Sequence, residues 1–376
     1  MTDQERIAIW NWSMTARVSG IPRKSFLYDF KGDYRNSLDQ LHHKIIPYGD
    51  LLLSASNKDG LVIFNRKEGV IVDRLSFSRC INGMVNNRHN GKYLFIDPYI
   101  VDLETLEIAH DPWPAFDAYG IEPRPRGRGF ITGHYAIREL NPDKKPGHWW
   151  VLDLNTWKET IQDVGASWPG WMFYDQGQVV CKAKENLQIR RISDMAIISE
   201  KEVLGFSAAI GNQSGIKLSF SDGGGCYLDD RTLNVIGTLN DEDCVGGVQF
   251  SDFSDRFSPL SVFTESRSDG DIFHCYHWKS KLILWRKKFN KFNQNYIAGD
   301  LVFASADGDR VLAIDKWTGD IVWEAEDPYQ PWSIHFYEKD VYFMDMGGNM
   351  RCYQWDEEYI SPHRPKDPNM AWIRPE

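Results

Sequence analysis

Ala304–Trp323 reads ASADGDRVLAIDKWTGDIVW. The segment contains an apolar run, an Asp-Gly turn, a second apolar run and then Asp-x-x-Thr, and variants of this phrase return about every 40 residues. Asp-Gly between two strand-like runs favours a tight hairpin, because its central residues need a positive φ that Gly adopts without strain. One such unit cannot bury its apolar face alone. The sequence therefore predicts an all-β fold built from repeated small sheets.

The position of Thr318 in this phrase is a marker for counting the repeats. Clear Asp-x-x-Thr phrases also end at Thr105, Thr156 and Thr232, and weaker versions fill the gaps between them. The complete set of markers is Glu68, Thr105, Thr156, Asp194, Thr232, Ser280, Thr318 and Glu357. Eight units of about 40 residues predict an eight-bladed β-propeller with four-stranded blades, and a seven-bladed propeller is the alternative.

The longest form of the phrase is Ala-x-Asp-x-x-Thr-Gly-x-x-x-Trp, and the residues that match it are Ala313, Asp315, Thr318, Gly319 and Trp323. This pattern resembles the tryptophan-docking motif of quinoprotein-type (PQQ-like) eight-bladed propellers. The resemblance implies that the motif joins the third and fourth strands of a blade, and that its Trp packs against the neighbouring blade. Ser280 with Trp285 is the next best match. The resemblance implies no particular activity, because a fold does not determine a function.

We expect residues 1–376 to form a single propeller domain, because no internal linker rich in Gly, Ser or Pro divides the chain. The last unit lacks an outer strand, because the prolines that follow residue 361 cannot donate to a β-ladder. Ile7–Trp12 is a spare strand ahead of the first unit. We therefore predict that this N-terminal strand pairs with residues 350–355 and closes the last blade, while the Pro-rich tail at 361–376 lies across the surface.

Composition limits the classes of partner. The net charge of −10 argues against a nucleic-acid partner, because such proteins usually present a basic face. No apolar run approaches the roughly 18 residues that a membrane span requires, and the charged start does not resemble a signal peptide. We expect a cytoplasmic monomer with no membrane association. The six cysteines show no Cys-x-x-Cys spacing, so buried free thiols are expected rather than disulfides or zinc ligands.

No cofactor, metal or catalytic residue is expected from the motifs. The enzymes that the docking motif resembles use an adjacent cysteine pair, which this chain does not have. Asp307 and Asp309 lack the further oxygen ligands of a calcium loop, and are expected to be turn residues. His274 and His277 are three apart on an expected strand, so they point to opposite faces. A Ser-His-Asp triad remains open, although no Gly-x-Ser-x-Gly elbow supports one.

Candidate binding residues lie in segments that join the expected blades. Three of these segments combine prolines with aromatic residues, and we predict contacts from Trp113, Phe116, Trp168, Trp171, Tyr329 and Trp332. The alternative is that each aromatic side chain fills a joint between two blades. A further loop concentrates positive charge at Arg124, Arg126 and Arg128. It is predicted to dock an acidic partner, and the alternative is an exposed loop without a role.

Two functional hypotheses follow. The first is a non-catalytic cytoplasmic protein whose propeller faces hold a protein partner; one concrete version is an immunity protein that neutralises a toxin. The second is an enzyme that acts on a carbohydrate or another small molecule in the central channel. Acidic charge and the lack of catalytic motifs favour the first hypothesis.

Overall fold

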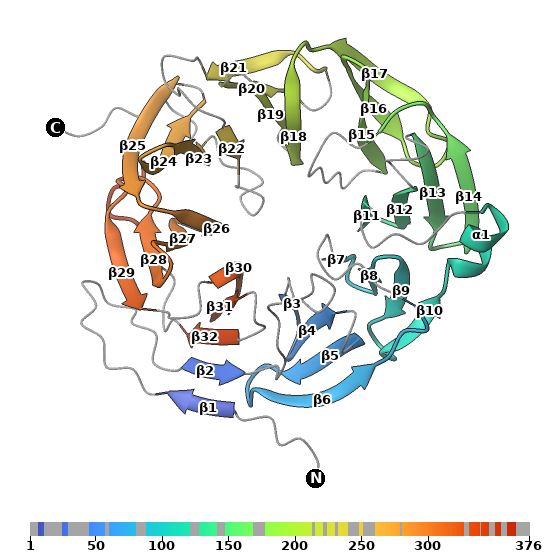
Figure 1. Cartoon of the computed structure of the whole chain (residues 1–376), viewed down its shortest axis with the longest axis horizontal. Helices are drawn as coiled ribbons and strands as arrows, with labels where there is room; N and C mark the ends of the chain where they lie inside the picture. Colours follow the sequence, from blue (N-terminus) through green and yellow to red (C-terminus); the bar gives the residue numbers. More distant parts are fainter. Residues whose placement is uncertain are drawn as a thin grey trace. The chain divides into compact units, whose positions relative to one another are not determined.

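The computed structural model describes residues 7–10, 25–28, 45–56, 60–79, 88–120, 128–140, 147–167, 177–212, 215–220, 224–229, 232–239, 248–250, 260–278, 280–326, 331–338, 340–345, 350–354 and 359–365. These residues form short antiparallel strands and one six-residue helix, which confirms the all-β prediction. The chain divides into two compact units, Asp33–Leu204 and Met1–Gly32 with Gly205–Glu376. Figure 1 shows the strands coloured in chain order.

The unit Asp33–Leu204 contains three four-stranded sheets and one sheet with three described strands. The first sheet consists of β3 (Ile45–Tyr48), β4 (Leu51–Ser56), β5 (Gly60–Asn65) and β6 (Val70–Leu75). The second consists of β7 (Arg88–His89), β8 (Tyr93–Ile96), β9 (Tyr99–Asp102) and β10 (Glu107–His110), and is followed by helix α1 (Trp113–Ala118). The third consists of β11 (Arg128–Thr132), β12 (Tyr135–Leu140), β13 (His148–Asp153) and β14 (Lys158–Asp163). The fourth consists of β15 (Gln178–Ala183), β16 (Asn186–Arg191) and β17 (Ile197–Glu202).

The other unit contains three four-stranded sheets and one five-stranded sheet. The first sheet consists of β18 (Phe206–Asn212), β19 (Gly215–Phe220), β20 (Gly225–Leu228) and β21 (Val235–Leu239). The second consists of β22 (Val248–Phe250), β23 (Leu260–Arg267), β24 (Gly270–His277) and β25 (Leu282–Phe289). The third consists of β26 (Phe292–Ala298), β27 (Leu301–Ala306), β28 (Arg310–Asp315) and β29 (Ile321–Glu326). The five-stranded sheet consists, in spatial order, of β1 (Ile7–Trp10), β2 (Ser25–Tyr28), β32 (Met350–Gln354), β31 (Asp340–Asp345) and β30 (Pro331–Tyr337).

The Asp-x-x-Thr phrases lie where the third strand of a sheet turns into the fourth, and the acid stabilises that turn. Asp315 Oδ1 accepts hydrogen bonds from the backbone N–H groups of Trp317, at 2.7 Å, and Thr318, at 3.1 Å. Asp102 and Asp229 accept equivalent bonds from the N–H groups of the Thr three residues later. An aspartate that accepts bonds from the backbone ahead of it forms an Asx turn, which explains why this residue type recurs.

The residue after each marker has a left-handed backbone. The φ angles lie between +54° and +77° at Gly69, Leu106, Trp157, Met195, Leu233, Lys281 and Gly319. The residue after Glu357 lies outside the described part of the chain. Seven of the eight markers counted in the sequence therefore occupy the same place in the same turn.

Docking between sheets follows the motif in the unit that contains residues 205–376. Trp285, on β25, donates from Nε1 to the backbone oxygen of Lys316 in the next sheet at 2.9 Å. Its ring lies against Gly319, where a Cβ atom would come within 2.6 Å of Trp285 Cγ. The glycine is required here for two reasons, since its φ is +77° and the indole leaves no room for a side chain. Trp285 therefore packs against the neighbouring sheet, as the resemblance to the docking motif implies.

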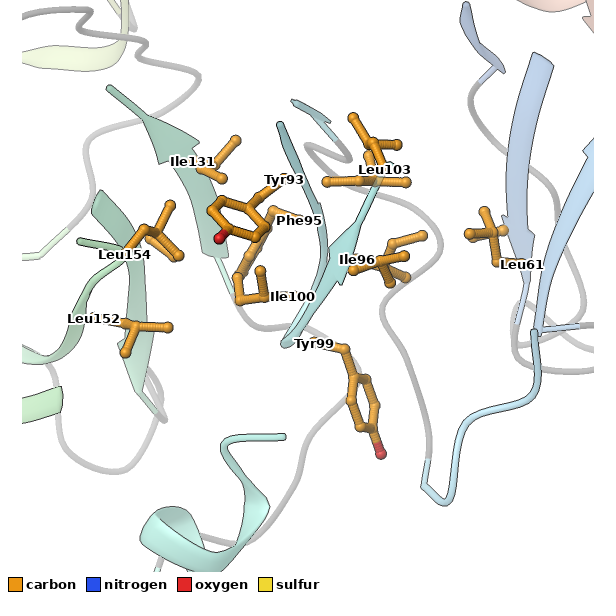
Figure 2. Close-up of a cluster of buried hydrophobic side chains, with 14 of the residues drawn as sticks. Leu61, Tyr93, Phe95, Ile96, Tyr99, Ile100, Leu103, Ile131, Leu152 and Leu154 are labelled. Carbon is orange, nitrogen blue, oxygen red and sulfur yellow. The ribbon is translucent and has the colours of Figure 1, made fainter. Parts of the chain in front are cut away.

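Each unit has apolar clusters that extend across several sheets. In the unit Asp33–Leu204, one cluster joins side chains of the first three sheets, including Leu61, Phe95, Tyr99 and Leu152 (Figure 2). In the other unit, a cluster around Trp285 and Trp317 joins the second and third sheets. A sheet this small buries its faces only against its neighbours, which explains why the clusters lie in the joints.

The predicted pairing of the N-terminal strand is wrong in detail. β1 pairs with β2 through four residue pairs, and it is β2 that lies beside β32, through Leu27↔Arg351 and Tyr28↔Met350 (Figure 1). The sequence Ser-Phe-Leu-Tyr of β2 is only four residues long and lies among charged residues, so it gave a weak strand signal. A hairpin presents β2 toward the sheet and leaves β1 as the outermost strand.

The chain after β32 leaves its own sheet and binds the preceding one. Tyr359 donates from its hydroxyl to Asp315 Oδ2 at 2.7 Å, and the backbone N–H of Ser361 donates to Asp300 Oδ2 at 3.1 Å. Asp300 also accepts from Trp317 Nε1 at 3.0 Å. The described start of the Pro-rich tail is thus held against two turns of the β26–β29 sheet.

Candidate functional site

Helix α1 carries the first of the predicted contact segments. Pro112 is its N-cap residue and Pro114 lies in its first turn, where proline is tolerated because the backbone N–H groups there have no helical partner. Asp111 Oδ1 accepts from the N–H of Trp113 at 3.0 Å and so satisfies one of these donors. Trp113 and Phe116 are three residues apart and therefore share one face of the helix.

The shared face of α1 points into the core, so Trp113 and Phe116 are not exposed anchors. Their exposed fractions are 3% and 0%. Phe116 packs edge-on against Trp113, with ring centroids 5.5 Å apart, and against Trp150 of β13 at 5.7 Å. The guanidinium of Arg138 lies 5.6 Å from the centre of the Phe116 ring. The alternative reading, that these aromatic residues fill a joint between sheets, describes their packing.

An ion pair covers the outer side of Trp113. Arg79, which follows β6, donates from both terminal nitrogens to the two carboxylate oxygens of Asp117 on α1, at 2.8 and 2.7 Å. The Arg79 guanidinium lies over the Trp113 ring, 5.3 Å from its centre. The paired Arg79 lowers the pKa of Asp117, and the Asp117 hydrogen bonds raise the pKa of Arg79, because each charge stabilises the other.

The backbone of Arg79 is held by a buried tyrosine. Tyr99 is fully buried in the cluster of Figure 2, yet its hydroxyl accepts from the Arg79 N–H at 3.0 Å and lies 3.1 Å from Ser78 Oγ. Phe77 packs on the Tyr99 ring at 4.8 Å. The segment after β6 is therefore attached to the core at the position from which Arg79 reaches α1.

These contacts define the α1 surface, which is the exposed set Ser78, Arg79, Asp111, Pro114, Asp117 and Tyr119. The side chains of Arg79 and Asp117 are 43% and 49% exposed, and Tyr119 is 59% exposed. Charged, aromatic and proline side chains are thus exposed on or next to α1, whose buried face is formed by Trp113 and Phe116.

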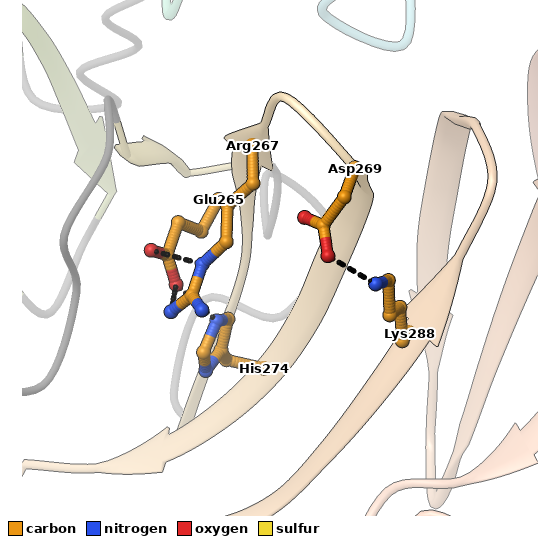
Figure 3. Close-up of polar contacts among 5 residues, drawn as sticks. All are labelled: Glu265, Arg267, Asp269, His274 and Lys288. Atoms are coloured by element: carbon orange, nitrogen blue, oxygen red, sulfur yellow. Dashed lines mark hydrogen bonds and ion pairs between the residues drawn. The ribbon is translucent and has the colours of Figure 1, made fainter.

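A second polar cluster lies within the β22–β25 sheet (Figure 3). Glu265, on β23, accepts from Arg267 Nε at 2.8 Å, and its other oxygen lies 3.0 Å from His274 Nε2 on β24. Glu265 and His274 are both fully buried, and the His274 ring stacks on Phe263 at 4.7 Å. Burial lowers the pKa of His274 to about 4, against the opposing effect of Glu265 and with a contribution from Arg286.

The His274 cluster supports a structural role more than chemistry. The neutral imidazole donates from Nε2 to Glu265, and its Nδ1 has no hydrogen-bond partner among the described atoms. His277 has a different partner, since its Nδ1 lies 2.7 Å from Ser280 Oγ. Within the described ranges, no group of three or more His, Cys, Asp or Glu side chains is placed to hold a metal ion.

Most of the other predicted contact residues lie outside the described residues. These are Trp168, Trp171, Tyr329, Arg124 and Arg126. Only the backbone is described for Trp332, in β30, and for Arg128, at the start of β11. Their roles stay predictions. No helix in the described part of the chain is long and apolar enough to cross a membrane.

No pattern in the sequence indicated Arg79 or Tyr99 as parts of a site. Arg79 and Asp117 are 38 residues apart, and neither belongs to a motif. The pairing depends on where two segments of different repeats come together, which only the folded chain shows.

Comparisons with known proteins agree with the repeat architecture. A family model described as "Outer membrane protein assembly factor BamB", of the PQQ-like repeat type, matches residues 261–354. No curated protein matches the chain. BamB from Moraxella catarrhalis is similar in structure, with a TM-score of 0.59 and 13% identity over 83% of this chain and 96% of that one. The computationally designed Ika8 protein is similar with a TM-score of 0.63 and 10% identity, over 85% of this chain and 98% of that one.

At these identities the two structures show a likeness in fold alone. The likeness covers most of this chain, and the family model covers the β23–β32 region, where the docking motif is best preserved. Residues 261–354 carry PQQ-like repeats, as the motif in the sequence predicted.

Proposed function

We propose that this protein is a non-catalytic binding protein that holds a protein partner on the segments joining its sheets. The α1 surface carries the proposal, because an exposed Arg–Asp pair and an exposed Tyr stand there on a rigid support. Arg and Tyr are enriched among the residues that dominate binding energies at interfaces. Segments that are ordered before binding lose little conformational entropy when a partner arrives.

The comparisons support the same class of function. The matching family model is described as an assembly factor for outer membrane proteins, which is a role toward other proteins. In this chain, the polar residues of the repeat motif are occupied within turns, as at Asp315 and Asp102. The exposed segments between sheets therefore offer the surface on which a partner would bind.

We further propose a cytoplasmic, monomeric protein without nucleic-acid or membrane partners. Cys181, Cys226, Cys275 and Cys352 are buried, and buried cysteines without disulfide or zinc-ligand spacing are usual in a reducing compartment. The net charge of −10 suits a basic partner, and an immunity protein that neutralises a basic toxin is one concrete version.

An enzyme acting in the central channel is the second candidate. The Glu265–His274 pair is the feature that favours it, since a carboxylate that orients a neutral histidine is a common catalytic arrangement. Both side chains are fully buried, however, so a substrate would reach them only if the sheet opened. The exposed α1 surface therefore gives binding the stronger support.

Affinity capture of the tagged full-length protein from its native cell, read by mass spectrometry, tests the proposal. We expect one protein to be recovered at near-equal amounts with the bait, and to be retained after washing at moderate salt. The same bait unfolded by heat before capture is the control. Recovery of no stoichiometric protein, together with turnover of a sugar or another small molecule that is lost in His274→Gln, would favour the enzyme.

A further inference from the structure

We propose that the α1 surface docks a basic segment of the partner, in which a Lys or Arg side chain lies beside an apolar residue. This inference rests on the proposed function and names the surface and the chemistry of the partner. The described residues that carry it are Arg79, Asp111, Asp117 and Tyr119.

The charge of the α1 surface favours a cation. Arg79 is already neutralised by Asp117 through two hydrogen bonds. Asp111 lies near enough to raise the pKa of Arg79, and its carboxylate forms no ion pair in the described part of the chain. The charges of two carboxylates thus act on one guanidinium, on a protein whose net charge is −10. A basic group that approaches this surface is attracted both locally and by the whole molecule.

The apolar part of the surface favours a hydrophobic neighbour for that cation. Tyr119 is 59% exposed at the end of α1, and Pro114 and Ala118 are exposed on the same helix. An aromatic ring that is half exposed gains by being covered, and it also attracts a cation to its face. The partner residue beside the Lys or Arg is therefore expected to be aliphatic or aromatic.

A buried donor beneath Arg79 gives an independent indication of a ligand. Trp113 is 97% buried, and its Nε1–H has no acceptor among the described atoms. Buried donors without an acceptor are rare, because each costs about 1 to 3 kcal/mol. A carbonyl oxygen of a partner that entered beside Arg79 would supply the missing acceptor.

The same charges disfavour other occupants. A second copy of this chain would bring two molecules of net charge −10 together through surfaces that each carry an excess carboxylate. Nucleic acid is disfavoured for the same reason. A basic protein segment is the occupant that fits both the charge and the exposed aromatic area.

Fluorescence anisotropy with two labelled peptides tests the chemistry on the full-length protein. The first probe is Gly-Ser-Arg-Phe-Lys-Leu-Arg-Ser-Gly, and in the second the three basic residues are replaced by Glu. We expect the basic probe to bind at least about tenfold more tightly than the acidic probe. Asp111→Asn and Asp117→Asn should each weaken the basic probe about fivefold, and Tyr119→Ala at least as much.

Matched controls separate docking from general attraction. Asp269, in the β22–β25 sheet, is an exposed carboxylate that forms an ion pair with Lys288 (Figure 3). It resembles Asp117, which is paired with Arg79. Asp269→Asn should change the affinity for the basic probe less than about twofold, since it removes the same charge elsewhere. Asp111→Asn keeps a side-chain oxygen that accepts from the backbone N–H of Trp113, so its melting temperature should equal that of the wild type. Equal weakening by Asp269→Asn and the α1 variants would overturn the proposal.

Photo-crosslinking in the native cell distinguishes failure of this inference from failure of the proposed function. A photoreactive phenylalanine replaces Tyr119 in one bait and Leu282, which is 48% exposed on β25, in the control. We expect the adduct from position 119 only, with a yield that falls about fivefold in Asp111→Asn. A partner that is captured but crosslinks from neither position, or only from 282, leaves the function standing and overturns the surface. The absence of any partner for every bait overturns both.

Discussion

The tryptophan joints show how single residues at two positions of the repeat fit one another. Trp285 packs on Gly319, whereas His110, at the equivalent of the Trp285 position, packs on Trp157, at the equivalent of Gly319. The ring centroids of His110 and Trp157 are 6.0 Å apart. The tryptophan thus lies on the fourth strand in one joint and at the turn in the other, where Trp157 remains 38% exposed. The side chain that fits at one position therefore depends on the residue at the other.

Gly319→Ala tests this joint. The substitution places a Cβ atom 2.6 Å from Trp285 Cγ at a φ of +77°, so we expect a loss of about 2 to 4 kcal/mol in the free energy of unfolding. Gly49 has a φ of +55° and open space around it, so Gly49→Ala carries the backbone cost alone, about 1 kcal/mol. Urea titrations of both variants give the difference. Equal losses would show that the indole does not restrict this position.

The marker position shows why some repeats were harder to recognise in the sequence. His277 occupies the place of Asp315 in its turn, and its Nδ1 accepts from the N–H of Ser280 at 3.1 Å. Arg191 occupies the same place in another turn and donates instead to Asp194 at 2.8 Å. The turn needs a polar side chain at this position, but not a particular one. Repeats with Asp were therefore clear in the sequence, whereas repeats with another residue were recognised only by their spacing.

At the scale of elements, strands were predictable and the joints between them were not. Alternating apolar runs around a turn identify a hairpin locally. For this reason the hairpin expected from the sequence at residues 301–315 is the one that β27 and β28 form. Asp307 and Gly308 in that turn have φ values of +55° and +89°, as the Asp-Gly prediction requires. The orientation of Trp113 and Phe116 depended on a helix that the prolines of the segment concealed. The rings of Trp113 and Phe116 lie in the core beneath the α1 surface, and a contact role for the other aromatic segments stays a prediction.

The β22–β25 sheet should be sensitive to acid because of His274. Its pKa is about 4 in the folded protein and near 6.5 in the unfolded chain, so between these values the unfolded state binds the extra proton. The contribution of neutral His274 to the free energy of unfolding is therefore fully present above pH 6.5, and it is lost as the pH decreases toward 4. The gap between the two pKa values corresponds to about 3 kcal/mol.

His274→Gln tests this dependence, because Gln can still donate to Glu265 but does not titrate. We expect its free energy of unfolding to change less between pH 7.5 and 5 than that of the wild type. His363→Gln removes an exposed histidine outside this cluster and is the matched control. Arg286 and Arg267 lower the pKa of His274 further, whereas Glu265 opposes them. Parallel profiles for wild type and His274→Gln would refute this assignment.

The C-terminal segment should contribute to stability through Tyr359. Burial and the nearby Asp315 raise the pKa of Tyr359, so its hydroxyl remains a donor at neutral pH. Tyr359→Phe removes a bond to a buried carboxylate, and we expect a loss of about 2 kcal/mol in the free energy of unfolding. Tyr119→Phe, at an exposed ring, should cost almost nothing. A loss in Tyr359→Phe no larger than in Tyr119→Phe would show that the segment is not held by this bond.

At the scale of the whole molecule, the repeat period predicted the architecture because each unit packs only against its neighbours. Eight markers in the sequence correspond to the succession of small sheets in the described residues, and the likeness to BamB extends over 83% of the chain. An eight-bladed closed ring stays a prediction. The identity of the strand that completes the last sheet was the part that the period did not determine, because that strand comes from the other end of the chain.

Cysteine pairs test which N-terminal strand completes the last sheet. Leu27 and Arg351 are opposite one another in neighbouring antiparallel strands, a spacing that fits a disulfide. We expect Leu27→Cys with Arg351→Cys to form an intrachain disulfide under mild oxidation, seen by peptide mass analysis. Ile9→Cys with Arg351→Cys should not form one, because β1 is separated from β32 by β2. Leu27→Cys alone controls for reaction with the neighbouring Cys352. A disulfide from Ile9→Cys instead would restore the pairing first expected from the sequence, with Ile7–Trp10 beside β32.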